Sequence, residues 1–187
     1  QRGHRRGHPR KARRTGRLTG VCEPVTILGV DTAIRKTGYA VLRLTASGLY
    51  EVADCGLIRN GKDLLHSECL RRLSGGIREI VNAFHPDSAS IEMAFVSKNI
   101  RTAMILSLAR GAVIASLAES SVPIYEYSPK TAKRAAVGRG EASKEQVAAM
   151  MAAICGIDIS GVPDDATDAL ALALCHANLS AHTELLL

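Results

Sequence analysis

Four carboxylates in this sequence occupy positions where a carboxylate would do chemistry. Glu92 lies in the apolar run ASIEMAFV, which is typical of a buried strand. Burying a lone carboxylate is unfavourable unless it is paired, hydrogen-bonded or bound to a metal. Asp31 directly follows a second apolar run, VTILGV. Asp165 and Asp168 are three residues apart, which would place both on one face of a helix.

If these four acids converge, they need a counter-charge. At about 4 Å and an effective dielectric constant near 20, each like-charged pair is unfavourable by roughly 4 kcal/mol. A divalent cation removes that repulsion, and carboxylates are hard oxygen ligands that suit Mg²⁺ or Mn²⁺. Two such ions, roughly 4 Å apart, can clamp the attacking and leaving oxygens of a phosphodiester. The acids therefore favour a metal-dependent phosphodiesterase, provided that they meet.

Three of the acidic positions also have a purely structural explanation. Asp164 and Asp165 follow Pro163 at the expected start of a helix, where the helix dipole favours negative charge. Asp31 fits a turn aspartate at the end of a strand. Glu92 has no comparable structural role, and it is therefore the strongest indication of a metal site.

The elements that must position these acids alternate between strands and helices. Predicted strands cover 25–30, 39–44, 49–58, 88–95 and 122–127, with a turn at Thr37-Gly38, and predicted helices cover 62–84, 99–119, 129–137, 143–155 and 163–180. This order predicts one α/β domain over residues 21–187, with a five-stranded mixed sheet of three antiparallel strands followed by two parallel ones. The helix at 99–119 is apolar nearly all round, so it is either deeply buried or packed against a second subunit.

The positive charge of the chain is concentrated at its start. The net charge is +6, but residues 1–18 hold eight Arg and Lys and no acid, which leaves 16 cations against 18 acids in the remainder. A solvated, disordered arm explains this, and so does an anchor for nucleic-acid phosphates, which we favour slightly. The arm has no apolar segment of a secretory signal, while an organelle transit segment is a minority alternative.

The other sequence features point to a reduced compartment without a membrane. Five cysteines with no C-x-x-C spacing argue against disulfides and zinc, and favour the cytoplasm. The segment that comes nearest to a membrane span, 100–118, contains Arg101 and Arg110.

Five motifs, in order along the chain, resemble one family. GVDTAIRKTGYAVL, IEMAFVSKN, LARG, EYSPKTAKRAAVGRGEASKEQV and DDATDALALA look like the RuvC Holliday-junction resolvases. The resemblance runs from about Ile27 to Ala177. It implies an RNase H-like fold and a homodimeric, Mg²⁺-dependent endonuclease that cuts opposed strands of a four-way DNA junction. It also implies two metal ions per site, with Mn²⁺ as an alternative, and a branch-migration motor complex as partner in the nucleoid.

The resemblance also assigns roles to particular residues. Asp31, Glu92, Asp165 and Asp168 match the catalytic, metal-binding acids, and Asp164 is an extra carboxylate beside the third. The residues that the resemblance implies for DNA contact are Phe95, which would stack on a base, and the basic residues Lys98, Lys133 and Lys144. Without the family, Phe95 fits core packing equally well, and the lysines fit a solvated face. Lys144 would lie in the first turn of a helix capped by Ser143 and Gln146.

One departure from the family lies beside the first acid. Thr32-Ala33 stands where the family usually has Pro-Gly. If this change disables the site, the chain is a junction-binding protein with weak catalysis. A further alternative is a related nuclease for another branched nucleic acid, because the acids alone do not separate it from the junction-resolving nuclease.

Overall fold

The computed structural model describes residues 24–93, 99–138, 140–141, 143–156 and 161–184. Its strands are β1 (Val25–Asp31), β2 (Lys36–Leu44), β3 (Tyr50–Arg59), β4 (Ser88–Glu92) and β5 (Ile124–Tyr127). Its helices are α1 (His66–Phe84), α2 (Ile100–Glu119), α3 (Pro129–Val137), α4 (Lys144–Cys155) and α5 (Asp164–Glu184). The predicted basic arm lies outside the described residues.

The five strands form one mixed sheet in the order β3-β2-β1-β4-β5. β2 is antiparallel to both β1 and β3, whereas β4 is parallel to both β1 and β5. This confirms the predicted α/β class and the predicted pattern of three antiparallel strands followed by two parallel ones.

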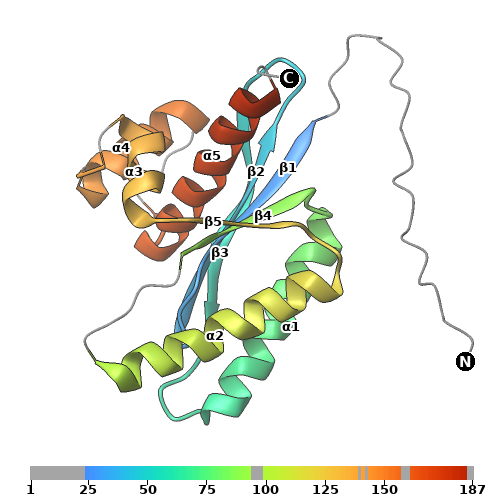
Figure 1. Cartoon of the computed structure of the whole chain (residues 1–187), viewed down its shortest axis with the longest axis vertical. Helices are drawn as coiled ribbons and strands as arrows, with labels where there is room; N and C mark the ends of the chain where they lie inside the picture. The colour runs from blue at the N-terminus through green and yellow to red at the C-terminus, as the bar shows by residue number, and fades with distance from the viewer. Residues whose placement is uncertain (1–23, 94–98, 139, 142, 157–160, 185–187) are drawn as a thin grey trace, which may run out of the picture.

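Helices cover both faces of the sheet. Figure 1 shows α1 and α2 on one side of the strands and α3, α4 and α5 on the other. The alternation of side chains along β1 supplies both cores, because successive residues of a strand point to opposite faces. Leu28 and Val30 join the core under α1 and α2, while Ile27 joins the core with Leu170 and Leu174 of α5.

The prediction of a turn at Thr37-Gly38 is wrong. Both residues lie inside β2, and Gly38 pairs with Asp31 of β1. A Cβ at Gly38 would stand only 1.9 Å from the backbone oxygen of Asp165, and one at Gly29 only 2.0 Å from that of Ala169. The two glycines therefore serve the close approach of α5 to the sheet, which periodicity cannot distinguish from a turn.

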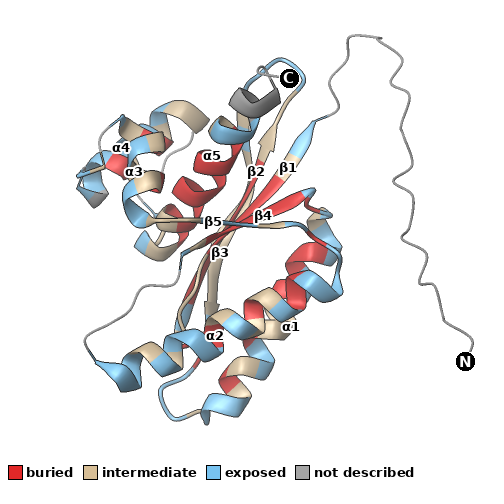
Figure 2. Ribbon diagram, in the orientation of Figure 1, coloured by how far each residue is buried: buried red, intermediate tan, exposed pale blue. Residues whose placement is uncertain are grey.

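α2 buries only a narrow stripe of its apolar surface. Ala109, Val113 and Leu117 are buried, whereas Met104 is 64% exposed and Leu108 is 52% exposed. Figure 2 shows the buried residues of α2 on its side toward the sheet and α1. By length and composition alone this helix could cross a membrane, with 22% of its apolar window buried. α2 is therefore not deeply buried on all sides: one stripe joins the core, and the rest of its apolar surface is exposed.

Candidate active site

The first two acids are neighbours across the sheet. Val30 of β1 is in register with Ile91 of β4, so Asp31 and Glu92, the next residues, end two adjacent parallel strands at the same edge. Adjacent strands lie about 4.8 Å apart. A side-chain hydrogen bond joins the Asp31 carboxyl to Glu92. Glu92 is the last residue of β4 and half-buried, so the expectation that it lies inside a strand ending at Phe95 is corrected.

α5 brings the second pair of acids to the same place. Because α5 rests on Gly29 and Gly38 of the sheet, its first turns lie directly beside the end of β1. Burial, followed by the negative charges of Glu92, Asp168 and Asp165, raises the pKa of Asp31 to about 7. Glu92, Asp165 and Asp168 are therefore close enough to Asp31 for their charges to act on it, which is the convergence that the sequence predicted.

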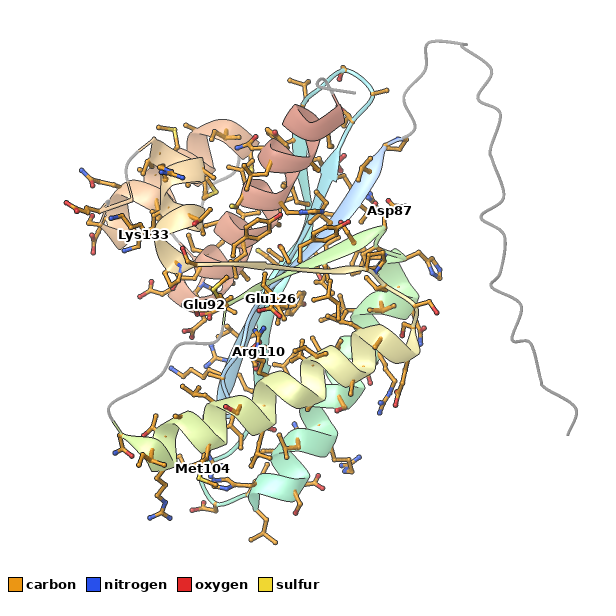
Figure 3. All side chains as sticks on the ribbon, viewed as in Figure 1. Asp87, Glu92, Met104, Arg110, Glu126 and Lys133 are labelled. Atoms are coloured by element: carbon orange, nitrogen blue, oxygen red, sulfur yellow. The ribbon has the colours of Figure 1, made fainter. Side chains whose placement is uncertain are left out.

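Three of the acids and one lysine are near a shared cavity. A cavity of about 290 Å³ is lined by Asp31, Glu92 and Asp168, and by Lys133 of α3. Its remaining walls are apolar or aliphatic: Pro129, Ala132, Val147, Ala171 and Leu172. Figure 3 shows Lys133 and Glu92 on the same side of the molecule. A cation thus faces a cavity with an excess of carboxylates, which is an arrangement that suits a phosphate together with metal ions.

Asp164 lies outside this cavity. It is exposed, and it lines a smaller hollow of about 140 Å³ together with Glu145, Thr167 and Asp168. Only Asp168 borders both spaces among the lining residues. The position of Asp164 therefore fits the favourable helix-dipole position better than a place among the converging acids.

The sequence analysis missed a residue that holds the end of β4. Arg110 of α2 donates to the backbone oxygen of Glu92 and forms an ion pair with Glu126 of β5 at 2.7 Å. Its side chain is only 15% exposed, and Figure 3 shows it between α2 and these two glutamates. A lone internal cation in an otherwise apolar helix was the signal that could have revealed it.

The carboxylate oxygens suit a hard divalent cation, although the described side chains do not form a complete coordination site. In the part of the chain that the structure describes, no three Asp, Glu, His or Cys side chains form a ready-made metal site. The groups around Asp31 nevertheless offer carboxylate oxygens, and the pKa of Asp31 is raised first by burial and then by the neighbouring negative charges. The hydroxyl oxygen of Thr32, next to Asp31, is buried without a hydrogen-bond partner. Both observations are consistent with an ion that completes the site.

The remaining predicted contact residues are only partly described. Phe95 and Lys98 lie outside the described residues. Lys144 is the first residue of α4, and the predicted capping box of Ser143 and Gln146 is confirmed. The DNA contacts of Phe95, Lys98, Lys133 and Lys144 stay predictions.

The matching family model and the two similar proteins named next have the same description. The family model described as crossover junction endodeoxyribonuclease RuvC matches residues 27–176. A relative of that name from Chlorobaculum parvum is 40% identical, over 83% of this chain and 85% of its own. One from Protochlamydia amoebophila is 39% identical, over 83% of this chain and 92% of its own.

Solved structures agree with the sequence matches. The structure of T. thermophilus RuvC in complex with Holliday junction substrate superposes with a TM-score of 0.80 at 28% identity, and the match covers 85% of this chain and 96% of that one. The yeast mitochondrial Holliday junction resolvase Ydc2 superposes with a TM-score of 0.65 at 14% identity, which shows a shared fold.

Proposed function

The chain belongs to the RuvC family of crossover junction endodeoxyribonucleases, and we propose that it resolves four-way DNA junctions by hydrolysing one phosphodiester in each of two opposed strands. The observation that carries this proposal is the group of carboxylates from β1, β4 and α5 at one edge of the sheet, where burial and then the neighbouring charges raise the pKa of Asp31. A cavity beside them, lined also by Lys133, offers room for the phosphate.

All four acids would bind the metal ions. Asp31, Glu92, Asp165 and Asp168 would be the ligands, and Mg²⁺, with Mn²⁺ as a substitute, suits their hard oxygens. When bound, two such ions supply an activated water and stabilise the charge on the leaving oxygen. Asp31 must give up its proton for this, since metal ligands bind in the deprotonated form.

Other residues would orient the DNA and the acids. Lys133 would contact a non-bridging oxygen of the scissile phosphate, as a point charge in the cavity wall. Arg110 would keep the Glu92 carbonyl, and with it the end of β4, in place. Phe95, Lys98 and Lys144 would add DNA contacts, Phe95 by stacking on an unpaired base.

A homodimer would present two such sites to one junction. A four-way junction has two-fold symmetry, which a C₂ dimer matches with two identical active sites. The exposed apolar residues of α2, Ile100, Met104 and Leu108, are the surface that such a dimer would bury. The basic arm would add sequence-independent phosphate contacts. A cytoplasmic, nucleoid-associated location and cooperation with a branch-migration motor complete the proposal.

A cleavage assay tests the proposal. A mobile four-way junction and a linear duplex of the same sequence are incubated with wild-type protein or Glu92→Gln, in Mg²⁺, in Mn²⁺ and in chelator. We expect paired nicks in opposed strands of the junction alone, lost in chelator and lost in Glu92→Gln while junction binding persists. Equal cleavage of the duplex would favour a less selective nuclease. Tight junction binding without cleavage in either metal would identify a binding protein disabled near Thr32-Ala33.

A further inference from the structure

A second and larger hollow lies away from the acids, between β3 and α1. Its volume is about 480 Å³. It is lined by Tyr39, Leu57, Ile58 and Arg59 from the sheet and by Arg71, Arg72, Gly75, Gly76, Glu79 and Ile80 from α1. We call it the β3–α1 groove. Its ionisable lining consists of three arginines, one glutamate and Tyr39, so it carries net positive charge.

Two consecutive glycines in α1 leave this groove open. Glycine weakens a helix relative to alanine, so a pair in mid-helix calls for a reason. Gly76 has one in packing, because a Cβ there would stand 2.9 Å from the side chain of Ile58. Gly75 has none, since a Cβ there would meet nothing within 4 Å. At Gly75 the missing side chain therefore leaves empty space in the groove wall.

The arginines of the groove differ in how they are held. Arg72 donates from Nε to the side-chain oxygen of the buried Asn60 at 3.2 Å, so its guanidinium is held while other donors remain. Arg71 is engaged by Glu68. Arg59 is exposed, and no described residue forms a hydrogen bond or an ion pair with its side chain. Arg59 and Arg72 thus offer guanidinium donors, which match the oxygens of phosphate.

The groove opens at the same end of the sheet as the acids. Both β1 and β3 run antiparallel to β2, where Asp31 and Leu57 are each paired with Gly38. Arg59 is therefore two residues, or about 7 Å, farther out than Asp31, and about two strand spacings, or 10 Å, to the side. Asp31 faces α5, and by strand alternation Arg59, the residue after Ile58, leaves β3 on that same face. Arg72, in contrast, lies on α1. A ligand that touches both Asp31 and Arg72 must therefore cross the end of the sheet beside Arg59. A DNA strand carries one phosphate per roughly 3.4 Å, enough to span this interval.

We propose that the β3–α1 groove is a second phosphate-binding site, which holds the backbone of a junction arm through Arg72, with Arg59 contacting the same strand where it crosses the end of the sheet. The inference rests on the proposed function for its ligand. DNA is favoured over a free anion because the groove is open and its cations lie at the edge that holds the catalytic acids.

The groove is tested by measuring how the affinity for a four-way junction depends on salt. A chelator is present so that the DNA is not cleaved. The double variant Arg59→Gln/Arg72→Gln is compared with Arg43→Gln/Arg78→Gln, which removes the same charge outside the groove. Each lost phosphate contact lowers the slope of log K against log salt by about 0.9. We expect the slope of log K against log salt to be smaller in magnitude by about two for the groove variant than for wild type. The control variant should have the wild-type slope. Equal slopes for wild type and both variants, or an equal decrease of the slope in both variants, would contradict phosphate binding in the groove.

A second pair of variants tests the groove by filling it. Gly75→Ala and Gly75→Glu both improve helix propensity, so neither is expected to unfold α1. Gly75→Glu adds bulk and negative charge to the groove and should weaken junction binding, whereas Gly75→Ala should not. Single-turnover cleavage by wild-type protein in Mg²⁺ is measured separately, because it reports on the acids and not on the groove. Wild-type protein that binds with the predicted slopes but does not cleave would refute the nuclease and leave the groove standing, while normal cleavage with unchanged binding would refute the groove alone.

Discussion

The fold raises the pKa of Asp31 toward neutral pH. Burial and the neighbouring charges of Glu92, Asp168 and Asp165 raise its pKa from 3.8 to about 7. The folded protein therefore retains a proton that the unfolded chain releases near pH 4. This proton linkage stabilises the metal-free fold below about pH 4, and the stabilisation is lost as the pH rises through about 7.

Asp31→Asn should remove this dependence. In chelator, the free energy of unfolding of wild-type protein should fall between pH 4 and 7, whereas that of Asp31→Asn should change less and be higher at pH 7. Urea denaturation at several pH values measures both. Glu92→Gln is the companion variant: it removes the largest neighbouring charge, so the pKa of Asp31 should fall and the loss of stability should be complete at lower pH. Parallel curves for wild type and Asp31→Asn would contradict this account.

At the scale of the elements, the site depends on how closely α5 approaches the sheet. The backbone of α5 lies where the Cβ atoms of Gly29 and Gly38 would be. Backbone atoms cannot rotate aside as a flexible side chain can, so this approach requires glycine at both positions. The approach places Asp165 and Asp168 beside the ends of β1 and β4.

Gly38→Ala should therefore damage both stability and activity. The added methyl must push α5 away from β2, which overpacks the core and should lower the free energy of unfolding by about 3 kcal/mol. Junction cleavage should fall further than binding, because two acids move with the helix. Gly75→Ala is the matched control, and it should raise stability by up to about 1 kcal/mol. A Gly38→Ala protein with wild-type stability and cleavage would show that α5 is not seated in this way.

The sequence was sufficient to predict the fold and the meeting of the four acids, and insufficient to predict what holds them. Apolar runs and helical spacing predicted each strand and helix of the described residues, and the carboxylates stood out because Glu92 had no structural role. The role of Gly38 could not be predicted, since a glycine between apolar residues fits a turn as well as a helix contact. Arg110 was missed because its partners, the Glu92 carbonyl and Glu126, are distant in sequence and meet only through the sheet.

The molecule as a whole leaves one helix under-packed. α2 exposes Ile100 at 75%, Met104 at 64% and Leu108 at 52%. The same helix holds the end of β4 through Arg110. A partner subunit on α2 would therefore lie close to the element that fixes Glu92.

Met104→Glu should separate association from folding. A charge on this exposed apolar surface should weaken the dimer by at least tenfold in Kd and leave the free energy of unfolding of the dilute monomer within about 1 kcal/mol of wild type. Analytical ultracentrifugation over a concentration series measures the first quantity. Leu49→Glu, at a residue 67% exposed in the β2–β3 hairpin, is the control that should not change association. Equal dimerisation of wild type and Met104→Glu would remove α2 from the proposed interface.

The central claim is that acids from β4 and α5 form one catalytic site. A double-mutant cycle tests it most directly, by single-turnover cleavage of a four-way junction with wild type, Glu92→Gln, Asp168→Asn and the double variant, each saturated with DNA. Residues that act as one unit are strongly non-additive. We predict that each single substitution lowers the rate by about 10³-fold or more and that the double variant is no slower than the slower single one. Losses that multiply in the double variant, or a single variant that keeps its wild-type rate, would contradict a shared site.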